Sequence, residues 1–487
     1  MGRRNKVLPL LEQVTIADAG AEGMAVARVD GMVVFVPFVV PGDVVDIQVY
    51  KQKKKYAEGR AVRFHKLSDL RVEAQCPHFG VCGGCKWQTM SYAAQLEAKQ
   101  RQVRDNLERL GGVDCTGMRP ICGSEEIYHY RNKLEFTFSN RAWRTKEQME
   151  AGEENGWGAL GFHIPQMFDK VLSIEQCVLQ AEPSNAIRLA VRDYAMANGL
   201  ECYDIRNHTG FLRNLVLRNT SLGDWMVIVI VAQDDPDRLF PLLDMLHERF
   251  PEITSLQYII NEKMNDSYSD LEVHTYCGED HIEEKMERVN DQSADVTTED
   301  NGEQTTRLHY IINPKSFYQT NSRQAQRLYS FVAEMAELRS TDTLYDLYTG
   351  TGTIAIFLAG KCRRVVGIEY VEEAIADARL NARRNGYDNT TFYAGDMAKV
   401  LTSEFITANG HPDVVVTDPP RAGMHEKVVE QLLAAAPRTI VYVSCNPATQ
   451  ARDLQLLAAK YEVRRIQPVD MFPHTQHVEN VAELVLK

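Results

Sequence analysis

The sequence predicts a multidomain α/β protein made of a small β-barrel, a central α+β domain and a C-terminal domain with a mostly parallel sheet. At 487 residues the chain is too long for one ordinary core, so two to four domains are expected. Short β-rich runs fill residues 8–65, whereas strand-like and helix-like segments alternate from residue 308 onward. That alternation is typical of a doubly wound sheet.

Residues 1–66 are expected to form the barrel. The runs MVVFVPFVV, DVVDIQVY and GRAVRFH are separated by turns at Gly31, Pro41-Gly42 and Gly59, and several short strands at this spacing indicate a small barrel. Such barrels often bind oligonucleotides, although a fold alone assigns no function. The basic run KQKKK could contact RNA, or it could simply be an exposed charged hairpin.

Residues 67–307 are expected to form the central α+β domain. SYAAQLEAKQRQVRDNLERLGG predicts a helix that ends on two glycines. β-rich runs follow between 128 and 275, with helices predicted at 182–198 and 236–249. Residues 279–303 then hold ten acidic and two basic residues, and the segment near 279–305 is predicted to be a solvated acidic loop.

The net charge of −13 argues on its face against a nucleic-acid partner. Most of it, however, comes from the acidic segment, whose net charge is −8, whereas residues 1–66 carry +4. The charge therefore does not exclude RNA. No apolar run reaches the ~18–20 residues that span a bilayer, and no signal peptide is recognised at the N-terminus. We expect a cytoplasmic protein without membrane contact, and a monomer.

The C-terminal domain, residues 308–487, contains a predicted cofactor pocket. DLYTGTGT joins a strand to a helix, and Gly350 and Gly352 permit the tight turn and close backbone approach that a bound cofactor needs. Glu369 ends the next strand, where a carboxylate can accept hydrogen bonds from both ribose hydroxyls. Taken alone, the two glycines also fit an ordinary turn.

Two further acids extend this pocket. Asp396 follows the third strand and Asp418 ends the fourth, in TDPPR, so the strand ends face one crevice at the carboxyl edge of the sheet. The dinucleotide fingerprint is incomplete, because Thr353-Ile354-Ala355 stands where it would continue. This pattern favours a cofactor without pyrophosphate, such as S-adenosylmethionine.

A thiol lies in the same predicted crevice. Cys445, in VYVSCNP, ends the strand after Asp418, and DMFPHTQHVEN places Glu479 just before the last strand. Methyl transfer to pyrimidine C5 requires both groups, since a thiolate must add at C6 and a base must remove the C5 proton. His474 and His477 are rival bases. A buried apolar cysteine and a surface salt bridge are the alternatives for the two residues.

Four motifs, DLYTGTGT, DPPRAG, SCNP and DMFPHTQHVE, together resemble the RNA uracil-C5 methyltransferases, which use S-adenosylmethionine on transfer or ribosomal RNA. The resemblance implies a Rossmann-like class I methyltransferase domain and an RNA-binding TRAM barrel at the N-terminus. It also implies that Cys445 is the nucleophile, Glu479 the base, and Phe317 a neighbour of the flipped uracil. The implied cofactor residues are Gln319, Tyr348, Gly350, Gly352, Thr353, Glu369, Asp396 and Asp418. Tyr348 and Thr353 depart from the family's usual Phe and Asn.

A cysteine cluster predicts a metal site in the central domain. Cys76, Cys82 and Cys85 are spaced C-x5-C-x2-C with glycines between them. Four thiolates bind zinc or an iron–sulfur cluster, and the lack of a second paired C-x2-C favours [4Fe–4S]. The resemblance implies Cys177 as the fourth ligand, although Cys115 or Cys122 fit the sequence equally well. Disulfides are the alternative, which the absence of a secretory signal disfavours.

HYRNKLEF supplies candidate RNA contacts, Arg131 and Lys133, among aromatic residues; a cationic strand edge explains them equally well. The target uridine must leave its stack to reach Cys445. We expect methylation of uridine C5, first in 23S ribosomal RNA, with transfer RNA as the alternative. An amino-group nucleic-acid methyltransferase and a non-enzymatic iron–sulfur RNA-binding protein are the competing hypotheses.

Overall fold

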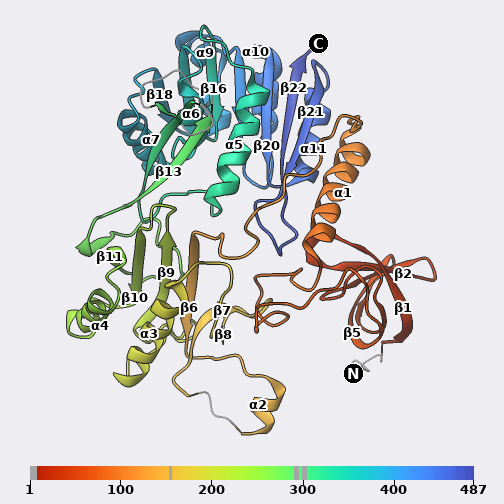
Figure 1. Cartoon of the computed structure of the whole chain (residues 1–487), viewed down its shortest axis with the longest axis vertical. Coiled ribbons are helices and arrows are strands. Elements are labelled where there is room, and N and C mark those ends of the chain that lie inside the picture. Colours follow the sequence, from red (N-terminus) through yellow and green to blue (C-terminus); the bar gives the residue numbers. More distant parts are fainter. Residues whose placement is uncertain (1–7, 153–155, 290–295, 299–303) are drawn as a thin grey trace.

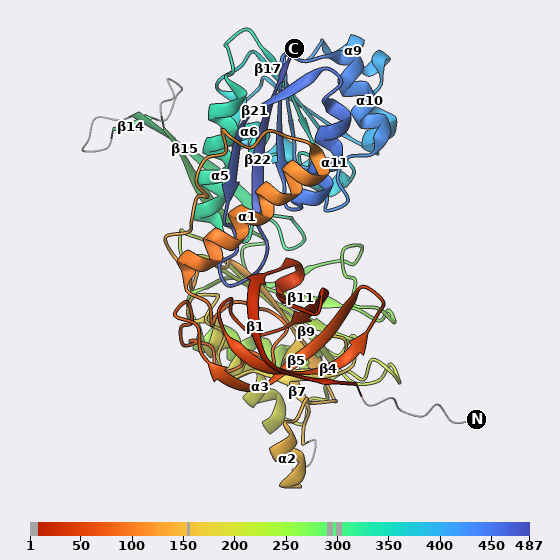
Figure 2. The ribbon, with the colours of Figure 1, turned by 90° about the vertical axis from the view of Figure 1, so that its right-hand side faces the viewer.

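A computed structural model of the chain describes residues 8–152, 156–289, 296–298 and 304–487. Figure 1 shows the parallel-sheet domain at one end, the central domain at the other, and the N-terminal barrel beside the central domain. The helix after the barrel runs along the parallel-sheet domain (Figure 2). Within the described residues, no helix is both long and apolar enough to cross a membrane.

The predicted barrel is confirmed: five strands close in the order β1-β2-β3-β5-β4. Its interior holds apolar side chains such as Ile16, Ala27, Val34 and Ile47, each at most 1% exposed. They come from alternate positions because successive side chains of a strand point to opposite faces. The elements are β1 (Leu10–Ala19), η1 (Ala21–Gly23), β2 (Ala25–Val29), β3 (Met32–Val36), β4 (Val44–Gln52) and β5 (Tyr56–Lys66).

The predicted helix after the barrel is α1 (Tyr92–Gly111). It ends where Gly112 takes the left-handed conformation, with φ of 64°, and donates its N–H to the last turn. Val103 and Leu107 are buried against the C-terminal domain, where α1 packs on α11 (Pro447–Leu457). This helix therefore joins the barrel side of the molecule to the C-terminal sheet.

The central domain is a seven-stranded mixed sheet in the order β12-β11-β10-β9-β6-β7-β8. Its strand β10 is apolar at every position because both of its faces are covered. Leu215 and Val227 pack with the two helices, whereas Val216 and Ile228 belong to a core shared with the C-terminal domain. The predicted helices are confirmed as α3 (Ser184–Ala197) and α4 (Pro236–Arg249). The other elements are β6 (Lys133–Ser139), α2 (Lys146–Glu150), β7 (Ala159–His163), β8 (Val171–Ser173), β9 (Leu212–Asn219), β10 (Trp225–Val231), β11 (Ile253–Ile260) and β12 (His274–Gly278).

The prediction of an acidic loop near 279–305 is wrong for the part that the structure describes. β13 (Ile282–Val289) pairs antiparallel with β15 (Gln304–Ile312), which also pairs with β14 (Val296–Thr298). Ile282 and Met286 of β13 are buried in the shared core, and Glu284 between them is buried on the same face, whereas Glu283 points to the other face. The strand is therefore charged in composition and yet half-buried. Residues 290–295 and 299–303 lie outside the described residues, and the predicted domain boundary at 308 falls inside β15.

The C-terminal domain confirms the doubly wound, mostly parallel sheet. Its order is β18-β17-β16-β19-β20-β22-β21. The first five strands are parallel to one another, and β22 runs antiparallel to both of its neighbours, β20 and β21. Two apolar cores cover its two faces. The elements are α5 (Ser322–Ala336), β16 (Thr343–Leu347), α6 (Thr353–Ala359), β17 (Arg364–Glu369), α7 (Glu372–Arg384), β18 (Thr390–Ala394), α8 (Met397–Val400), α9 (Ser403–Asn409), β19 (Val414–Thr417), α10 (Glu426–Ala435), β20 (Thr439–Ser444), β21 (Tyr461–Val469) and β22 (Glu479–Leu486).

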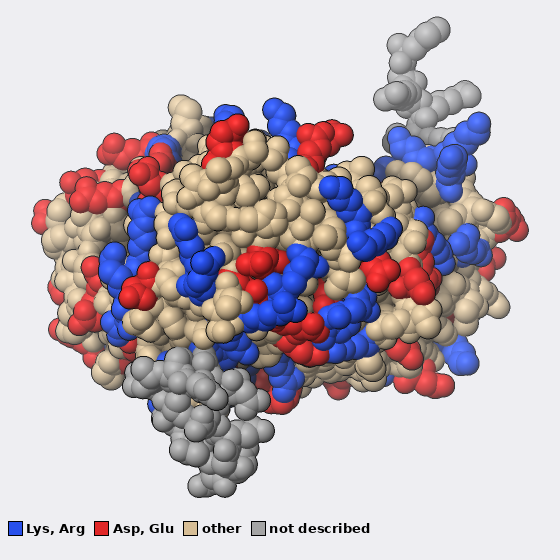
Figure 3. Space-filling view, turned by 90° about the horizontal axis from the view of Figure 1, so that it is seen from above, with Lys and Arg blue, Asp and Glu red and all other residues tan. Residues whose placement is uncertain are grey.

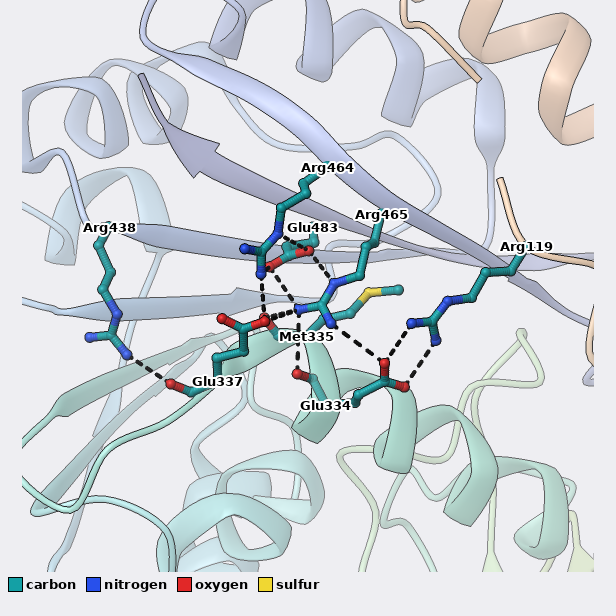
Figure 4. A network of polar contacts seen from close by, with 8 residues as sticks. All are labelled: Arg119, Glu334, Met335, Glu337, Arg438, Arg464, Arg465 and Glu483. Carbon is teal, nitrogen blue, oxygen red and sulfur yellow. Dashed lines mark hydrogen bonds and ion pairs between the residues drawn. The ribbon is translucent and has the colours of Figure 1, made fainter. Parts of the chain in front are cut away.

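A network of charged side chains fastens α5 to the antiparallel edge of this sheet (Figure 4). The Glu483 side chain on β22 is fully buried and accepts hydrogen bonds from Arg464 and Arg465 of β21. Both arginines also contact Glu337, which caps the end of α5, at 2.5 and 2.7 Å. On the face seen in Figure 3, Lys and Arg lie among Asp and Glu.

Candidate active site

The predicted nucleophile and base lie on neighbouring strands. Ser444, the last residue of β20, pairs with Asn480 of β22 in antiparallel register. Cys445 and Glu479 occupy the next positions, one step past Ser444 and one step before Asn480, so they face each other across the pair. The structure therefore brings together two residues that are 34 positions apart in the sequence.

The turn after Cys445 is fixed by side-chain bonds. Asn446 caps α11 by accepting from the Ala448 N–H at 3.2 Å, and Pro447 occupies the first helical position, where no N–H is needed. Asn446 also donates to the Arg421 carbonyl oxygen at 3.0 Å, which ties the turn to the DPPRAG loop. The SCNP motif thus holds the thiol at the mouth of the sheet.

The site has an excess of acidic groups. Burial, with the carboxyls of Glu479 and Asp418, raises the pKa of Cys445 to about 11, against a smaller lowering by Arg421. Burial likewise raises the pKa of Glu479 well above its ordinary value. For Asp418, burial and the nearby Asp346 raise the pKa to about 7. The neutral forms of these groups are therefore favoured until positive charge enters the site.

The glycine turn has the geometry that the sequence predicts. Gly350 and Gly352 adopt φ of 54° and 79° between β16 and α6. A Cβ at Gly352 would lie 2.9 Å from the Cβ of Ala378, so glycine is needed there for packing against α7. A Cβ at Gly350 would meet nothing within 4 Å. The open side of the turn is therefore at Gly350, whereas Gly352 serves helix packing.

Of the other predicted cofactor residues, two lie at the ends of neighbouring strands, whereas the side chain of Thr353 points to α5. Glu369 ends β17 and accepts from the Gly350 N–H at 3.2 Å, and Asp396 caps α8. The Thr353 hydroxyl, however, lies 3.1 Å from the Tyr329 hydroxyl on α5. The backbone carbonyl oxygen of Gln319 accepts a hydrogen bond from the side-chain amide of Asn132, in the central domain, at 2.9 Å. Tyr348 is half-buried with a left-handed φ of 64°, a strained conformation that clusters at functional sites.

Two features of this pocket were not predicted from the sequence. The side chain of Asp346 is buried, and its Oδ1 has no hydrogen-bond partner among the described residues, while its Oδ2 accepts from Thr349 at 2.5 Å. Tyr370, directly after Glu369, is 75% exposed. Both residues could have been found with the strand-end rule that identified Glu369 and Asp418, because both lie at strand ends within motifs of the sequence.

The loop that leads to Glu479 is held in place by contacts with α1. These contacts were not predicted from the sequence. The Lys99 ammonium lies 2.6 Å from Asp470, and both side chains are 0% exposed. Gln95 accepts from the His474 N–H at 2.8 Å, and the His474 ring stacks on Tyr128 at 4.4 Å. The segment from 470 to 477 is therefore fixed by helix α1 and by the central domain before it enters β22.

A cavity of about 1100 Å³ opens beside this loop. His477 and Thr475 line it, as does the segment from Ser316 to Tyr318. Neither Cys445 nor Glu479 belongs to its lining, but His477 stands only two residues before Glu479. Burial and the charge of Arg421 lower the pKa of His477 to about 4, so its ring is neutral.

The predicted RNA contacts line this cavity. Arg131, Lys133 and Phe317 all contribute to it, and the Phe317 side chain is 68% exposed. Arg218, which sequence analysis missed, is buried beside them and donates to three carbonyl oxygens of the segment before Phe317. Burial and the charge of Arg218 lower the pKa of Lys133. The cavity therefore concentrates positive charge next to an exposed aromatic ring.

The cysteines Cys76, Cys82, Cys85 and Cys177 line the same cavity. Cys115 and Cys122, the other candidates for the fourth ligand, do not. Among the described residues, no three His, Cys, Asp or Glu side chains converge as the ligands of a metal ion. The four predicted thiols therefore line one space, without three of them converging as metal ligands.

Two family models match the chain. The model of tRNA (uracil-5-)-methyltransferase matches residues 285–486, and the TRAM domain model matches residues 12–62. The first range contains Cys445, Glu479 and the glycine turn, and it begins inside β13. The second covers most of the five-stranded barrel.

Whole-chain relatives agree. A Bacteroides thetaiotaomicron protein described as an uncharacterized RNA methyltransferase is 53% identical over 96% of this chain and 100% of its own length. A Porphyromonas gingivalis protein with the same description is 52% identical over 96% and 99%. The solved Pyrococcus abyssi tRNA (uracil-54, C5)-methyltransferase, in complex with S-adenosyl-L-homocysteine, is 28% identical with a TM-score of 0.70, covering 97% of this chain and 100% of that one. The chain therefore belongs to the RNA (uracil-5-)-methyltransferase family.

Proposed function

We propose that this enzyme methylates C5 of uridine in RNA through a covalent bond between Cys445 and C6 of the base. The cross-strand placement of Cys445 and Glu479 carries the proposal, because it sets a nucleophile and a base at one point of the sheet edge. The same placement argues against an amino-group methyltransferase, which needs no thiol. Membership of the family argues against a non-enzymatic role.

The proposed reaction consists of addition at C6, methyl transfer to C5 and elimination. The Cys445 thiolate adds to C6, and the electron pair released onto C5 attacks the donor's methyl carbon, so that the neutral thioether product leaves. The Glu479 carboxylate then removes the C5 proton, and the C6–S bond breaks to restore the thiolate. A methyl-sulfonium donor supplies the methyl group and a positive charge, and that charge favours the ionised forms of Cys445, Asp418 and Glu479.

The pocket at the glycine turn suits S-adenosylmethionine. The open side of Gly350 leaves room for the donor, and Glu369 lies where a ribose would be bound. The unpartnered Oδ1 of Asp346 can accept a hydrogen bond from an ammonium group. Asp396, Asp418, Tyr348 and Gln319 remain proposed contacts, whereas Gly352 and Thr353 are proposed to act through helix packing and through Tyr329.

We propose that 23S ribosomal RNA is the substrate, with transfer RNA as the second candidate, which the likeness to the Pyrococcus abyssi enzyme favours. Arg131, Lys133 and Phe317 would hold the RNA strand in the cavity, from which the flipped uridine would have to reach Cys445. Comparing methyl incorporation into 23S fragments and into transfer RNA, both made by transcription, separates the two. Incorporation into transfer RNA alone would contradict the first choice.

We propose that the four thiols hold a [4Fe–4S] cluster. They line one space, and N–H groups approach their sulfurs: those of His78 and Phe79 at Cys76, and that of Leu179 at Cys177. Hydrogen bonds to sulfur are a regular feature of such sites. Iron and sulfide analysis of anaerobically purified protein tests the cluster, and zinc in place of iron would contradict it.

A 5-fluorouridine RNA tests the mechanism, because fluorine at C5 cannot be removed as a proton. With S-adenosylmethionine, the enzyme should form a protein–RNA adduct that survives denaturation. The Cys445→Ala variant should form none, while still binding S-adenosyl-L-homocysteine. The mechanism is wrong if the wild type forms no adduct on an RNA whose normal version it methylates.

A further inference from the structure

The loop between β7 and β8 exposes an aromatic ring at the rim of the cavity. Phe168 is 63% exposed and Met167 is 38% exposed, and both line the cavity that contains Arg131, Lys133 and Phe317. These exposed side chains therefore border the space that we assign to the RNA strand.

The loop that carries Phe168 is firmly held. Ile164 donates its N–H to the Lys170 carbonyl oxygen at 3.0 Å, which closes the loop. Asp169 turns inward and is 6% exposed, and it accepts from Arg206 at 2.7 Å and from Arg141 at 3.3 Å. Because Asp169 anchors the loop on the inside, Phe168 is presented to solvent by an ordered turn.

Two residues of this loop, Phe168 and Lys170, each take part in a cation–aromatic pair. The Arg206 guanidinium lies 5.4 Å from the Phe168 ring centre, and the Lys170 ammonium lies 5.5 Å from the Trp143 ring centre. Trp143 is fixed next to the loop, because its N–H donates to the Val171 carbonyl oxygen at 2.7 Å. Aromatic faces flanked by cations bind the bases and phosphates of single strands.

We propose that Phe168, with Trp143, Lys170 and Arg206, is a stacking site for an unpaired nucleotide that neighbours the target uridine. The proposal rests on the proposed function, since it assumes that RNA enters the cavity. The occupant is single-stranded RNA rather than an apolar protein segment, because the two rings carry cations and the one acid among them, Asp169, is already neutralised. The site would lengthen the proposed RNA path along the rim of the cavity, on the central domain.

The test measures binding of the full-length enzyme to two fluorescent 12-nucleotide RNAs, oligouridine and an abasic strand of the same charge. Stacking is worth about 1–3 kcal/mol per base, so Phe168→Ala should weaken oligouridine binding roughly 5- to 100-fold and abasic binding far less. Phe168→Trp should restore the preference for bases. Met196→Ala, an exposed apolar residue at the end of α3, is the matched control and should bind as the wild type does.

Equal oligouridine affinity of Phe168→Ala and the wild type would overturn the inference and leave a protein partner as the occupant of the ring. Equal losses on the oligouridine and abasic strands would also overturn it, because the ring would then act through structure alone. The proposed function fails separately, if the wild type forms no 5-fluorouridine adduct. With saturating RNA, Phe168→Ala should still form that adduct.

Discussion

The ammonium group of Lys99 lies 2.6 Å from the carboxylate of Asp470, and neither side chain is exposed to solvent. The pair joins α1 to the segment that leads into β22, so it fixes the approach of Glu479 to Cys445. Asp470 is further held by the Tyr92 hydroxyl at 2.8 Å, and Lys99 also donates to the Phe472 carbonyl oxygen at 3.0 Å. The strand ends that carry Cys445 and Glu479 thus depend on a helix encoded far upstream.

Lys99→Met should destabilise the protein strongly, because it leaves the Asp470 charge buried and unpaired. Removing one partner of a buried pair costs about 3–5 kcal/mol. The Lys99→Met/Asp470→Leu double variant should lose much less than the sum of the two single losses in urea unfolding. Additive losses would show that the two side chains do not depend on each other.

Glu479→Gln should trap the enzyme on ordinary RNA, because the amide cannot remove the C5 proton. We expect a protein–RNA adduct on denaturing gels that decays at least about tenfold more slowly than in the wild type. His477→Asn is the matched comparison, since the neutral His477 ring is the rival base. If His477→Asn accumulates the adduct and Glu479→Gln does not, the roles of the two residues are reversed.

Gly350→Ala should weaken S-adenosyl-L-homocysteine binding about tenfold or more, because the new Cβ would enter the open side of the turn. Gly386→Ala is the control: that glycine, at the end of α7, has a φ of 72° and equally open surroundings. Both changes carry the same left-handed strain of about 1–2 kcal/mol. Calorimetric binding should therefore separate them, and equal affinities would place the donor elsewhere.

The placement of the proposed catalytic residues at one edge of the sheet could be predicted, because the strand-end rule needs only local sequence. Cys445 and Glu479 stand at the limits of two strands, and Glu369 and Asp418 at two more, so the alternation of elements was enough to bring them to one edge. The same rule says nothing about the orientation of a side chain. Thr353 therefore fits the cofactor pattern in sequence, yet its hydroxyl contacts Tyr329.

The supporting contacts could not be predicted, because they join residues that no local pattern connects. Lys99 resembles any other lysine of a charged helix, and 371 positions separate it from Asp470. The prediction of a solvated loop in the acidic segment was wrong for another reason. Its composition indicates a solvated loop, but Ile282 and Met286 recur at even spacing among the acids and bury one side of β13.

Glu483→Gln should reduce stability in a pH-dependent way. Burial raises the pKa of this carboxyl, but the guanidiniums of Arg465 and Arg464 outweigh burial and hold the pKa below its ordinary value. A lowered folded-state pKa stabilises the fold fully above the unfolded value of about 4.3, and the gain is lost as pH falls through the folded pKa. The variant should therefore lose about 1–3 kcal/mol of unfolding free energy at neutral pH.

The loss should begin to shrink as pH falls below about 4.3, where the carboxyl is protonated in the unfolded chain, and it should vanish only below the lowered folded-state pKa, where the carboxyl is uncharged in both states. Urea unfolding at neutral pH and near pH 3.5 measures it. Glu462→Gln, an exposed glutamate on β21, is the matched control and should change stability by less than about 0.5 kcal/mol at either pH. If the Glu483→Gln loss is the same at both pH values, the charge on Glu483 does not contribute, and the ion network is held together by packing alone.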